Sequence, residues 1–591
     1  MLKLTFLSNV RRRLARSEAQ VQLAVLGTLS GLGAGALIVL FRMSFEIPQH
    51  ALLPDNVPGN YEALQPLLRF ALPILGALLI AAGFQYLTKS ERRVGVGHVI
   101  ERLQHHQGYL PLKNLIIQFI VGSITILSGH SAGREGAAVH LGAASGSQLG
   151  QFLNLPNNTI RILLGCGTAA AISASFNTPI AGVIFAMEVV MMEYTINTFV
   201  PVILASVSGA IITRMVYGHE PAFELPTLTM SSLYELPFLL VMGVAIGFFA
   251  AIFNHTAVFI AKKSIDINLW IRLSLAGVIT GSVALFVPEI MGIGYDTLAQ
   301  ALNGQLTLLL LVSVFIAKLF VTAICVGLGL PTGLIGPSLV IGAGFGAIMG
   351  IMGSYFVPNF ASDAEFYAIL GMGAMMGAVL NAPLAALTTL MEMTANTHIV
   401  MPGMLVIVVS NLVAREYFNN KPIFTALLEI QGIQQRNHPL AQWLERSSVT
   451  EVMETQVVRQ HYLLSIGDAE SLLQKKPAWI VIDKENAPIS LLPTSDLASH
   501  LNKLKAQAEN DNEIAATPLN PEDNINLLEI AAQRKDIAPI DLQATLREAV
   551  DMLNISGVEA LYVERNNSTG HKNFYGIITR RALENFYSYR P

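Results

Sequence analysis

Charged residues are scarce in this sequence. Asp, Glu, Lys and Arg make up 13% of the 591 residues, hydrophobic residues make up 52%, and the mean hydropathy is +0.51. A water-soluble globule carries more charge than this, so the composition excludes that class and predicts a polytopic membrane protein. The formal net charge of −4 gives no basis for binding nucleic acid.

Cysteines and enzyme motifs are also lacking. Cys166 and Cys325 are the only cysteines, and both stand in apolar surroundings, so a disulfide framework is not expected. The sequence has no HExxH metal motif and no P-loop, and the GxSG spacing of a rhomboid-type protease is absent around Ser145. We therefore predict no enzyme, no metal site and no required cofactor.

The charge that is present is most concentrated at the carboxyl end. From Arg446 to Pro591, 35 of 146 residues are charged, against 43 in the first 445. This change predicts a membrane body with a soluble tail. The boundaries that we expect are an amino-terminal segment at 1–20, a membrane domain at 21–432, a linker at 433–445 and a tail at 446–591.

A basic cluster, Arg11 to Arg16, precedes the first long apolar span. By the positive-inside rule it predicts a cytoplasmic amino terminus. The cluster follows a short apolar run instead of preceding one, so no cleavable signal peptide is expected. We expect a multi-pass protein of a bacterial inner membrane or plasma membrane.

Long apolar runs recur from about residue 21 to residue 417, and many are interrupted by glycine or proline. Several are shorter than the ~20 residues that an upright helix needs to cross a membrane. Short, broken helices at membrane depth are tolerated where protein or a water-filled cavity surrounds them, and in transporters they often mark the binding site. The runs therefore predict an all-α membrane domain of short, tilted helices.

The membrane domain contains an internal repeat. "FNTPIAGVIFAMEV" (176–189) aligns without gaps to "LNAPLAALTTLMEM" (380–393), and "GREGAAVHLGAASGSQLG" (133–150) aligns to "GLIGPSLVIGAGFGAIMG" (333–350). The two blocks keep their order at nearly the same offset. This predicts two inverted repeats that meet at the membrane midplane, a recurrent plan in transporters.

An Arg–Glu pair stands in the second of these blocks. An ionisable residue at membrane depth costs roughly 2.5–3.5 kcal/mol, so Arg134 and Glu135 are functional candidates. Gly133 and Gly136 have no Cβ, and the backbone beside them can approach a ligand closely. If a helix begins here, its amino terminus presents free N–H groups to an anion, for which a carboxylate would compete.

The loop at the corresponding position of the second repeat has the same design. The residues concerned are Gly333, Leu334, Ile335, Gly336 and Pro337, and proline suits the first turn of a helix. Two helix starts from duplicated halves would then converge on one anion.

These features resemble the CLC family of chloride channels and chloride/proton antiporters. The resemblance rests on Gly133-Arg134-Glu135-Gly136, on the loop at 333–337 and on a tail that looks like a pair of CBS motifs, and it covers 21–591. It implies a homodimer with one anion pathway per subunit, backbone amides as anion ligands and Glu135 as the gate. The transported species would be chloride or a similar anion, with protons as a second candidate.

Three positions depart from the family pattern. The family's GSGIP segment is here Gly95-Val96-Gly97-His98-Val99, so Val96 replaces a serine hydroxyl; Phe424 replaces a tyrosine. Both are still expected to line the anion site, which would then depend on main-chain N–H groups.

The third departure is Val189, which stands where antiporters of the family usually carry a proton-relaying glutamate. Valine carries no proton, so the residue favours a passive channel; an exchanger with another proton route stays an alternative. For Glu188 we prefer a structural role, in which it satisfies helix amides, because Glu392 is its repeat mate. We expect His98 and His140 to be hydrogen-bonded packing residues, although His98 could titrate near the inner mouth.

The tail has an α/β pattern. "PAWIVID" and "ALYVERN" predict strands, and "GDAESLLQ" and "LREAVDMLNIS" predict helices. The resemblance divides it into cytosolic CBS motifs at 446–502 and 527–591, with a mobile polar insert at 503–526. Asp496 and Thr579 match residues that bind adenosine nucleotides in such motifs, but each half lacks the residue that the other keeps. A nucleotide site and a purely dimer-stabilising tail both stay open.

Overall fold

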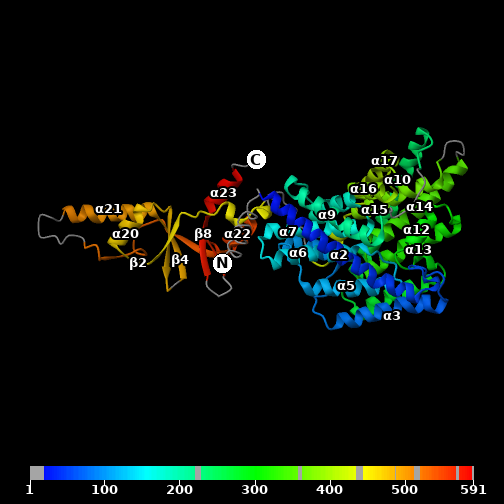
Figure 1. Ribbon diagram of the computed structural model, residues 1–591, viewed down its shortest axis with the longest axis horizontal. Helices are drawn as coiled ribbons and strands as arrows, with labels where there is room; N and C mark the ends of the chain where they lie inside the picture. The colour runs from blue at the N-terminus through cyan, green and yellow to red at the C-terminus, as the bar shows by residue number, and fades with distance from the viewer. Residues whose placement is uncertain are drawn as a thin grey trace. The chain divides into compact units, whose positions relative to one another are not determined.

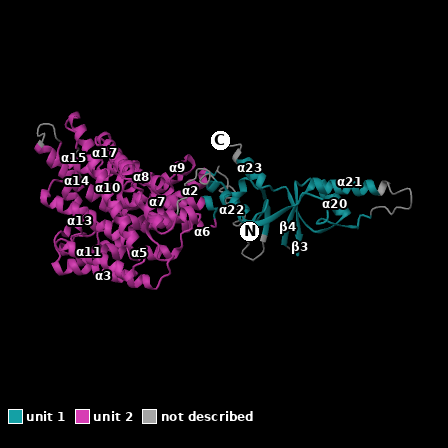
Figure 2. Cartoon of the chain, turned by 180° about the vertical axis from the view of Figure 1, so that it is seen from behind, with its two compact units in different colours: residues 1–19, 155–158, 437–591 teal, residues 20–154, 159–436 magenta. Residues whose placement is uncertain are grey.

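The computed structural model describes residues 19–219, 228–356, 362–433, 444–485, 487–510, 520–566 and 572–588. They form two compact units, which Figure 2 distinguishes by colour. One unit comprises residues 20–154 and 159–436 and is helical, and the other comprises residues 1–19, 155–158 and 437–591 and holds the strands. The basic cluster at Arg11 to Arg16 and most of the predicted linker lie outside the described residues.

The first half of the helical unit consists of long and short helices (Figure 1), and its short helix α8 continues into the π-helical segment η2. Its elements are α2 Gln20–Leu52, η1 Pro54–Asn56, α3 Pro66–Gln85, α4 Gly95–His105, α5 Leu112–Leu127, α6 Glu135–Phe152, α7 Asn157–Phe176, α8 Pro179–Phe185, η2 Ala186–Met191 and α9 Ile196–Tyr217.

The second half follows with a similar mixture of long and short helices. Its elements are η3 Leu233–Glu235, α10 Leu236–Ser264, α11 Leu269–Ala284, η4 Pro288–Ile290, α12 Tyr295–Leu302, α13 Leu308–Gly327, α14 Ile335–Phe356, α15 Ala364–Leu380, α16 Pro383–Thr394, α17 Val400–Leu412, η5 Val413–Tyr417 and α18 Ile423–Ile430. In the described part of the chain, 8 helices are long and apolar enough to cross a membrane.

The segments that the sequence pairs as repeats adopt matching local structures. α8 and α16 each begin with a proline, and each is preceded by an asparagine in the left-handed region, Asn177 at φ 59° and Asn381 at φ 55°. Asparagine tolerates this conformation better than most residues. Each helix therefore follows the same sharp turn, as the gapless alignment suggests.

Glu188 and Glu392 exchange equivalent contacts between these helices. Glu188 accepts hydrogen bonds from the backbone N–H groups of Leu384 and Ala385 at 3.3 and 2.7 Å, at the start of α16. Glu392 accepts from Ile180 and Ala181 at 3.0 and 2.7 Å, at the start of α8. Each carboxylate thus satisfies amides that a helix start leaves free. The geometry matches the structural role expected for Glu188.

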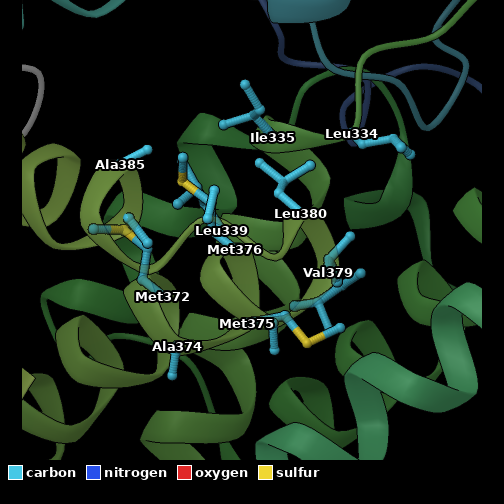
Figure 3. Close-up of a cluster of buried hydrophobic side chains, with 14 of the residues drawn as sticks. Leu334, Ile335, Leu339, Met372, Ala374, Met375, Met376, Val379, Leu380 and Ala385 are labelled. Atoms are coloured by element: carbon cyan, nitrogen blue, oxygen red, sulfur yellow. The ribbon is translucent and has the colours of Figure 1, made fainter. Parts of the chain in front are cut away.

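The largest of several apolar clusters in the helical unit reaches the beginning of α14. Figure 3 shows Leu334, Ile335 and Leu339 in the same cluster as side chains of α15. Leu334 and Ile335 are 2% and 1% exposed. Close packing leaves such residues few alternative positions, so the start of α14 is held rigidly.

The tail forms a six-stranded sheet in the order β1-β3-β4-β6-β7-β8. β1 pairs in parallel with β3, which pairs antiparallel with β4; β6, β7 and β8 repeat this pattern. The elements are η6 Val449–Glu451, β1 Val457–His461, β2 Leu463–Ser465, α20 Ile466–Gln474, β3 Trp479–Lys484, β4 Ala487–Pro493, α21 Thr494–Asn510, β5 Asn524–Asn526, β6 Lys535–Asp541, α22 Leu546–Ser556, β7 Ala560–Asn566, β8 Lys572–Thr579 and α23 Arg580–Ser588.

The local predictions for the tail agree with these elements. The expected helix "LREAVDMLNIS" is α22 and the expected strand "ALYVERN" is β7, with the same end residues. The expected insert 503–526 differs at its ends, because α21 continues to Asn510 and β5 begins at Asn524. Residues 511–519 lie outside the described residues.

Candidate anion-binding site

The two glycine loops that the sequence pairs are joined directly. The N–H of Gly133 donates to the carbonyl of Gly333 at 2.9 Å, and the N–H of Gly333 donates to the carbonyl of Gly133 at 2.9 Å. A Cβ added at Gly333 would lie 2.5 Å from that carbonyl oxygen and 2.7 Å from the nitrogen of Gly136. Both contacts are to backbone, so only glycine permits this approach. The starts of α6 and α14 therefore lie next to each other.

Glu135 is the first residue of α6, and its carboxylate is held at the start of α14. The side chain is 0% exposed. Its Oε2 accepts a hydrogen bond from the N–H of Gly336 at 3.1 Å, and its Oε1 accepts one from the hydroxyl of Tyr295. The carboxylate thus accepts a hydrogen bond from one of the backbone amides that a helix start would offer to an anion.

Arg134 interacts with other groups. Its Nη2 donates to the carbonyl of Ser175 at 2.7 Å, and its Nη1 lies 3.9 Å from Oε1 of Glu46. The guanidinium also faces the ring of Tyr295, 5.2 Å from the centroid. The ion pair of Arg134 is therefore with Glu46, and its link to Glu135 runs through Tyr295.

Several predicted anion ligands line one cavity, the motif cavity. It has a volume of about 510 Å³, and its walls include Gly95, Val96, Gly97, Leu334 and Phe424. His98 and Thr332 also line it.

Not every predicted ligand in this cavity has a free amide. The N–H of Gly95 donates to Oε1 of Gln118 at 2.7 Å. The amides of Leu334 and Ile335 have no acceptor among the described residues, and Pro337 has no N–H to offer. The hydroxyl oxygen of Thr332 is buried and likewise has no partner among the described residues. Uncommitted donors thus lie at residues 332–335 and also at the start of α4, where the amides of Val96 and Gly97 have no acceptor among the described residues.

A second cavity, the arginine cavity, has a volume of about 650 Å³. Arg42, Glu46, Arg134, Tyr295 and Asp296 are among its lining residues. The carboxylate of Glu135 contacts Tyr295, which lines the arginine cavity. It also contacts Gly336, two residues after Leu334, which lines the motif cavity. The carboxylate of Glu135 therefore lies between the two cavities.

Comparison with known proteins places this geometry in a family. The family model described as voltage gated chloride channel matches residues 75–415. The chain belongs to this family. As a member, it is an integral multi-pass membrane protein that transports anions, and it is not an enzyme.

A ClcB-like protein of Ralstonia nicotianae is similar to this chain. The two are 30% identical over 393 residues, which cover 65% of this chain and 91% of the relative. The H(+)/Cl(-) exchange transporter ClcA of Vibrio cholerae is 28% identical over 338 residues, 55% of this chain and 72% of the relative. A solved eukaryotic CLC transporter is similar with a TM-score of 0.57 at 17% identity, covering 95% of this chain and 97% of that one. That likeness shows the fold.

Sequence reasoning missed Tyr295 of this CLC site and also Lys318, whose Nζ would lie 2.7 Å from a Cβ at Gly294, a lining residue of the arginine cavity. Tyr295 is separated from Glu135 by 160 residues, and no motif marked its hydroxyl. Lys318 of α13 is 0% exposed, and its Nζ donates to the carbonyl of Ile290 at 3.1 Å. The position of Lys318 in an apolar span could have marked it in the sequence, because a buried charge in such a span is a functional candidate.

The two candidate nucleotide residues in the tail of this CLC protein are engaged within the fold. Oδ2 of Asp496 accepts a hydrogen bond from the N–H of Gln533 at 3.0 Å. Oγ1 of Thr579 accepts from the N–H of Ala582 at 3.2 Å, next to the start of α23. The structure does not bring Asp496 and Thr579 into a common described cavity.

Proposed function

We propose that the chain moves chloride or a similar anion across a membrane, and that Glu135 is the gate. The observation that carries this proposal is the carboxylate of Glu135 bound to the N–H of Gly336 at 3.1 Å. A carboxylate and a halide compete for the same helix-start amides, so an anion passes only when Glu135 leaves.

The anion is bound mainly by the main chain in this proposal. The amides of Leu334 and Ile335 point to no acceptor in the described part of the chain. Val96 and Phe424 bring no hydroxyl to the motif cavity, whereas the hydroxyl of Thr332 is available there. The path then runs from the motif cavity past Glu135 to the arginine cavity, where Arg134 attracts the anion.

The wider architecture belongs to the same proposal. Membrane segments 21–432 form two inverted repeats, an arrangement supported by the reciprocal contacts of Glu188 and Glu392. The tail, 446–591, is a cytosolic CBS pair, supported by a strand pattern that occurs twice in one sheet. The chain works as a homodimer in a bacterial inner or plasma membrane, with both termini cytoplasmic. No cofactor is required, and an adenosine nucleotide at Asp496 and Thr579 stays an alternative.

Two transport modes have support. Val189 favours passive flow, because valine cannot relay protons. A second mode, exchange of anions for protons, is favoured by two buried histidines, His98 and His140, that contact each other beside the motif cavity. The relative from Vibrio cholerae is named as an exchanger of this kind.

Chloride flux from liposomes that contain the purified protein tests the function. We expect wild-type protein to release chloride, and Glu135→Gln and Glu135→Ala to change the flux by about tenfold or more, as loss of ~1.4 kcal/mol of interaction would predict. Wild-type flux in both variants would show that Glu135 is not the gate. Liposomes that release magnesium but no chloride would show that the protein transports a divalent cation, and this would reject anion transport.

A further inference from the structure

Two buried histidines from neighbouring helices contact each other. Nδ1 of His98, on α4, lies 2.9 Å from Nε2 of His140, on α6, and the rings stack with their centroids 5.2 Å apart. The side chains are 3% and 0% exposed. The anion path proposed above leaves both of them without a role.

The hydrogen bonds determine which nitrogens carry protons in the neutral pair. Nε of Arg102 donates to Nε2 of His98 at 3.2 Å, and a guanidinium can only donate. Nε2 of His98 is therefore the acceptor and its Nδ1 carries the proton. That proton is donated to Nε2 of His140, so the proton of His140 is on Nδ1.

Nδ1 of His140 is buried and has no partner among the described residues. A buried donor of this kind destabilises the fold unless something accepts its proton. The pair thus has an engaged end at His98 and an open end at His140.

The engaged end reaches the motif cavity, because His98 is one of its lining residues. The titratable or charged groups around it are Arg93, Arg102 and His106, together with Glu101, which pairs with Arg93. Around His140 the described group of this kind is His98. A proton from water in the cavity can therefore reach the pair through His98.

The helical turn that precedes His140 lies beside the loop that binds the gate carboxylate. His140 follows Gly136 by one helical turn and shares its face of α6, and helical side chains lean toward the amino terminus. A Cβ at Gly136 would lie 3.0 Å from the carbonyl oxygen of Thr332. The buried hydroxyl of Thr332 has no partner among the described residues, and Glu135 is bound to Gly336 in the same loop.

His140 and Glu135 are five residues apart on α6, which is ~7.5 Å along the helix axis and about 140° around it. A proton that passes from His140 to Glu135 therefore needs groups beside the helix, and the hydroxyl of Thr332 together with water can supply them. Val189, where the family's proton carboxylate is expected, lies in the apolar core that also includes α4.

We propose that His98, His140 and Thr332 form a proton path between the motif cavity and Glu135, in place of a carboxylate at Val189. This rests on the proposed function, in which Glu135 gates the anion, and makes the protein a proton-coupled exchanger.

Each step of this path conserves the number of protons. A proton from cavity water binds Nε2 of His98 when Arg102 moves aside, and the Nδ1 proton of His98 passes to Nε2 of His140. The Nδ1 proton of His140 then leaves through the hydroxyl of Thr332 to the carboxylate of Glu135. One proton has entered and one has left, both rings hold their proton on Nε2, and reorientation of the rings restores the start.

Proton movement driven by a chloride gradient tests the path, in liposomes that contain the full chain. We expect the wild type to pump protons uphill. His140→Gln, His98→Gln and Thr332→Val should lower the proton flux by about tenfold or more, the usual size of a lost proton-transfer group. The chloride flux of His140→Gln should persist, because His140 lines neither cavity, and this also shows that the variant is folded.

His255→Gln is the matched control, because His255 is part-buried and its Nδ1 contacts the carbonyl of Ala251 on its own helix. It should keep the wild-type proton flux. Chloride flux without uphill proton pumping in the wild type would reject the path and leave the proposed gate intact. Pumping that survives all three substitutions would reject the path as well, whereas loss of chloride flux in the wild type would reject the proposed function itself.

Discussion

At the scale of single residues, Glu135 depends on two donors that are far away in the sequence. Gly336 is separated from it by 201 residues and Tyr295 by 160. A hydrogen bond to a charged group contributes roughly 1.5–3 kcal/mol. The closed position of Glu135 is therefore stabilised by these donors, and the removal of either should favour the open position.

Tyr295→Phe removes one of them and leaves the ring in place. We expect the chloride flux of this variant to rise by about tenfold, since ~1.4 kcal/mol of lost interaction corresponds to that factor. Chloride efflux from liposomes at neutral pH measures it.

Tyr217→Phe is the control for this substitution. Tyr217 also lines the arginine cavity, but its hydroxyl donates to Oε2 of Glu46 at 3.1 Å. The chloride flux of Tyr217→Phe should stay close to that of the wild type. Equal fluxes for Tyr295→Phe and the wild type would show that the tyrosine hydroxyl does not hold the gate.

At the scale of elements, the helix starts of the two halves are held by each other's side chains. Glu188 at η2 accepts from the start of α16, and Glu392 on α16 accepts from the start of α8. Neither bond belongs to the anion path. These hydrogen bonds have a structural role, because they satisfy backbone amides at the starts of two interrupted helices inside a membrane domain.

Glu188→Ala should therefore lower stability without altering ion selectivity. Two amides lose their acceptor, and the free energy of unfolding should fall by about 1–3 kcal/mol. Thermal unfolding of the detergent-solubilised protein measures this, and Glu188→Gln should recover part of the loss because its carbonyl still accepts.

Glu416→Ala serves as the comparison. Glu416 is 63% exposed and its ion pair is with the adjacent Arg415, a kind of contact that contributes little. A melting temperature for Glu188→Ala equal to that of Glu416→Ala would contradict the structural role.

At the scale of the whole molecule, each of the two units has its own apolar core. The largest core of the helical unit includes Val96 and Leu428, whereas the cores of the tail are built from residues from Leu444 onward. Both cavities of the helical unit are lined by residues up to Gln431. The candidate anion-binding site is thus built from residues of the helical unit.

A chain that ends at Ile433 should consequently keep its chloride flux within about threefold of the full chain, because a unit with its own core can fold alone. Efflux per reconstituted protein measures the effect. A truncated chain that is folded, as judged by a single thermal transition, but does not transport would place the tail in the transport mechanism.

The sequence by itself determined the features that depend on neighbours along the chain. The scarcity of charge predicted the membrane class, the glycine motifs predicted the helix starts at Glu135 and Ile335, and the alternating pattern predicted β7. Such features follow from periodicity, missing Cβ atoms and local hydrogen bonds, all of which can be read within about ten residues.

Only the tertiary structure decided which distant groups meet. The hydroxyl of Tyr295 on Glu135, the pairing of Arg134 with Glu46 and the contact of His98 with His140 all depend on how helices pack. Packing selects one arrangement among many that share the same local pattern, because close-packed interiors accept few combinations of side chains. The sequence therefore singled out Glu135, which we propose as the gate, and the fold supplied the groups that hold it and the path by which we propose a proton reaches it.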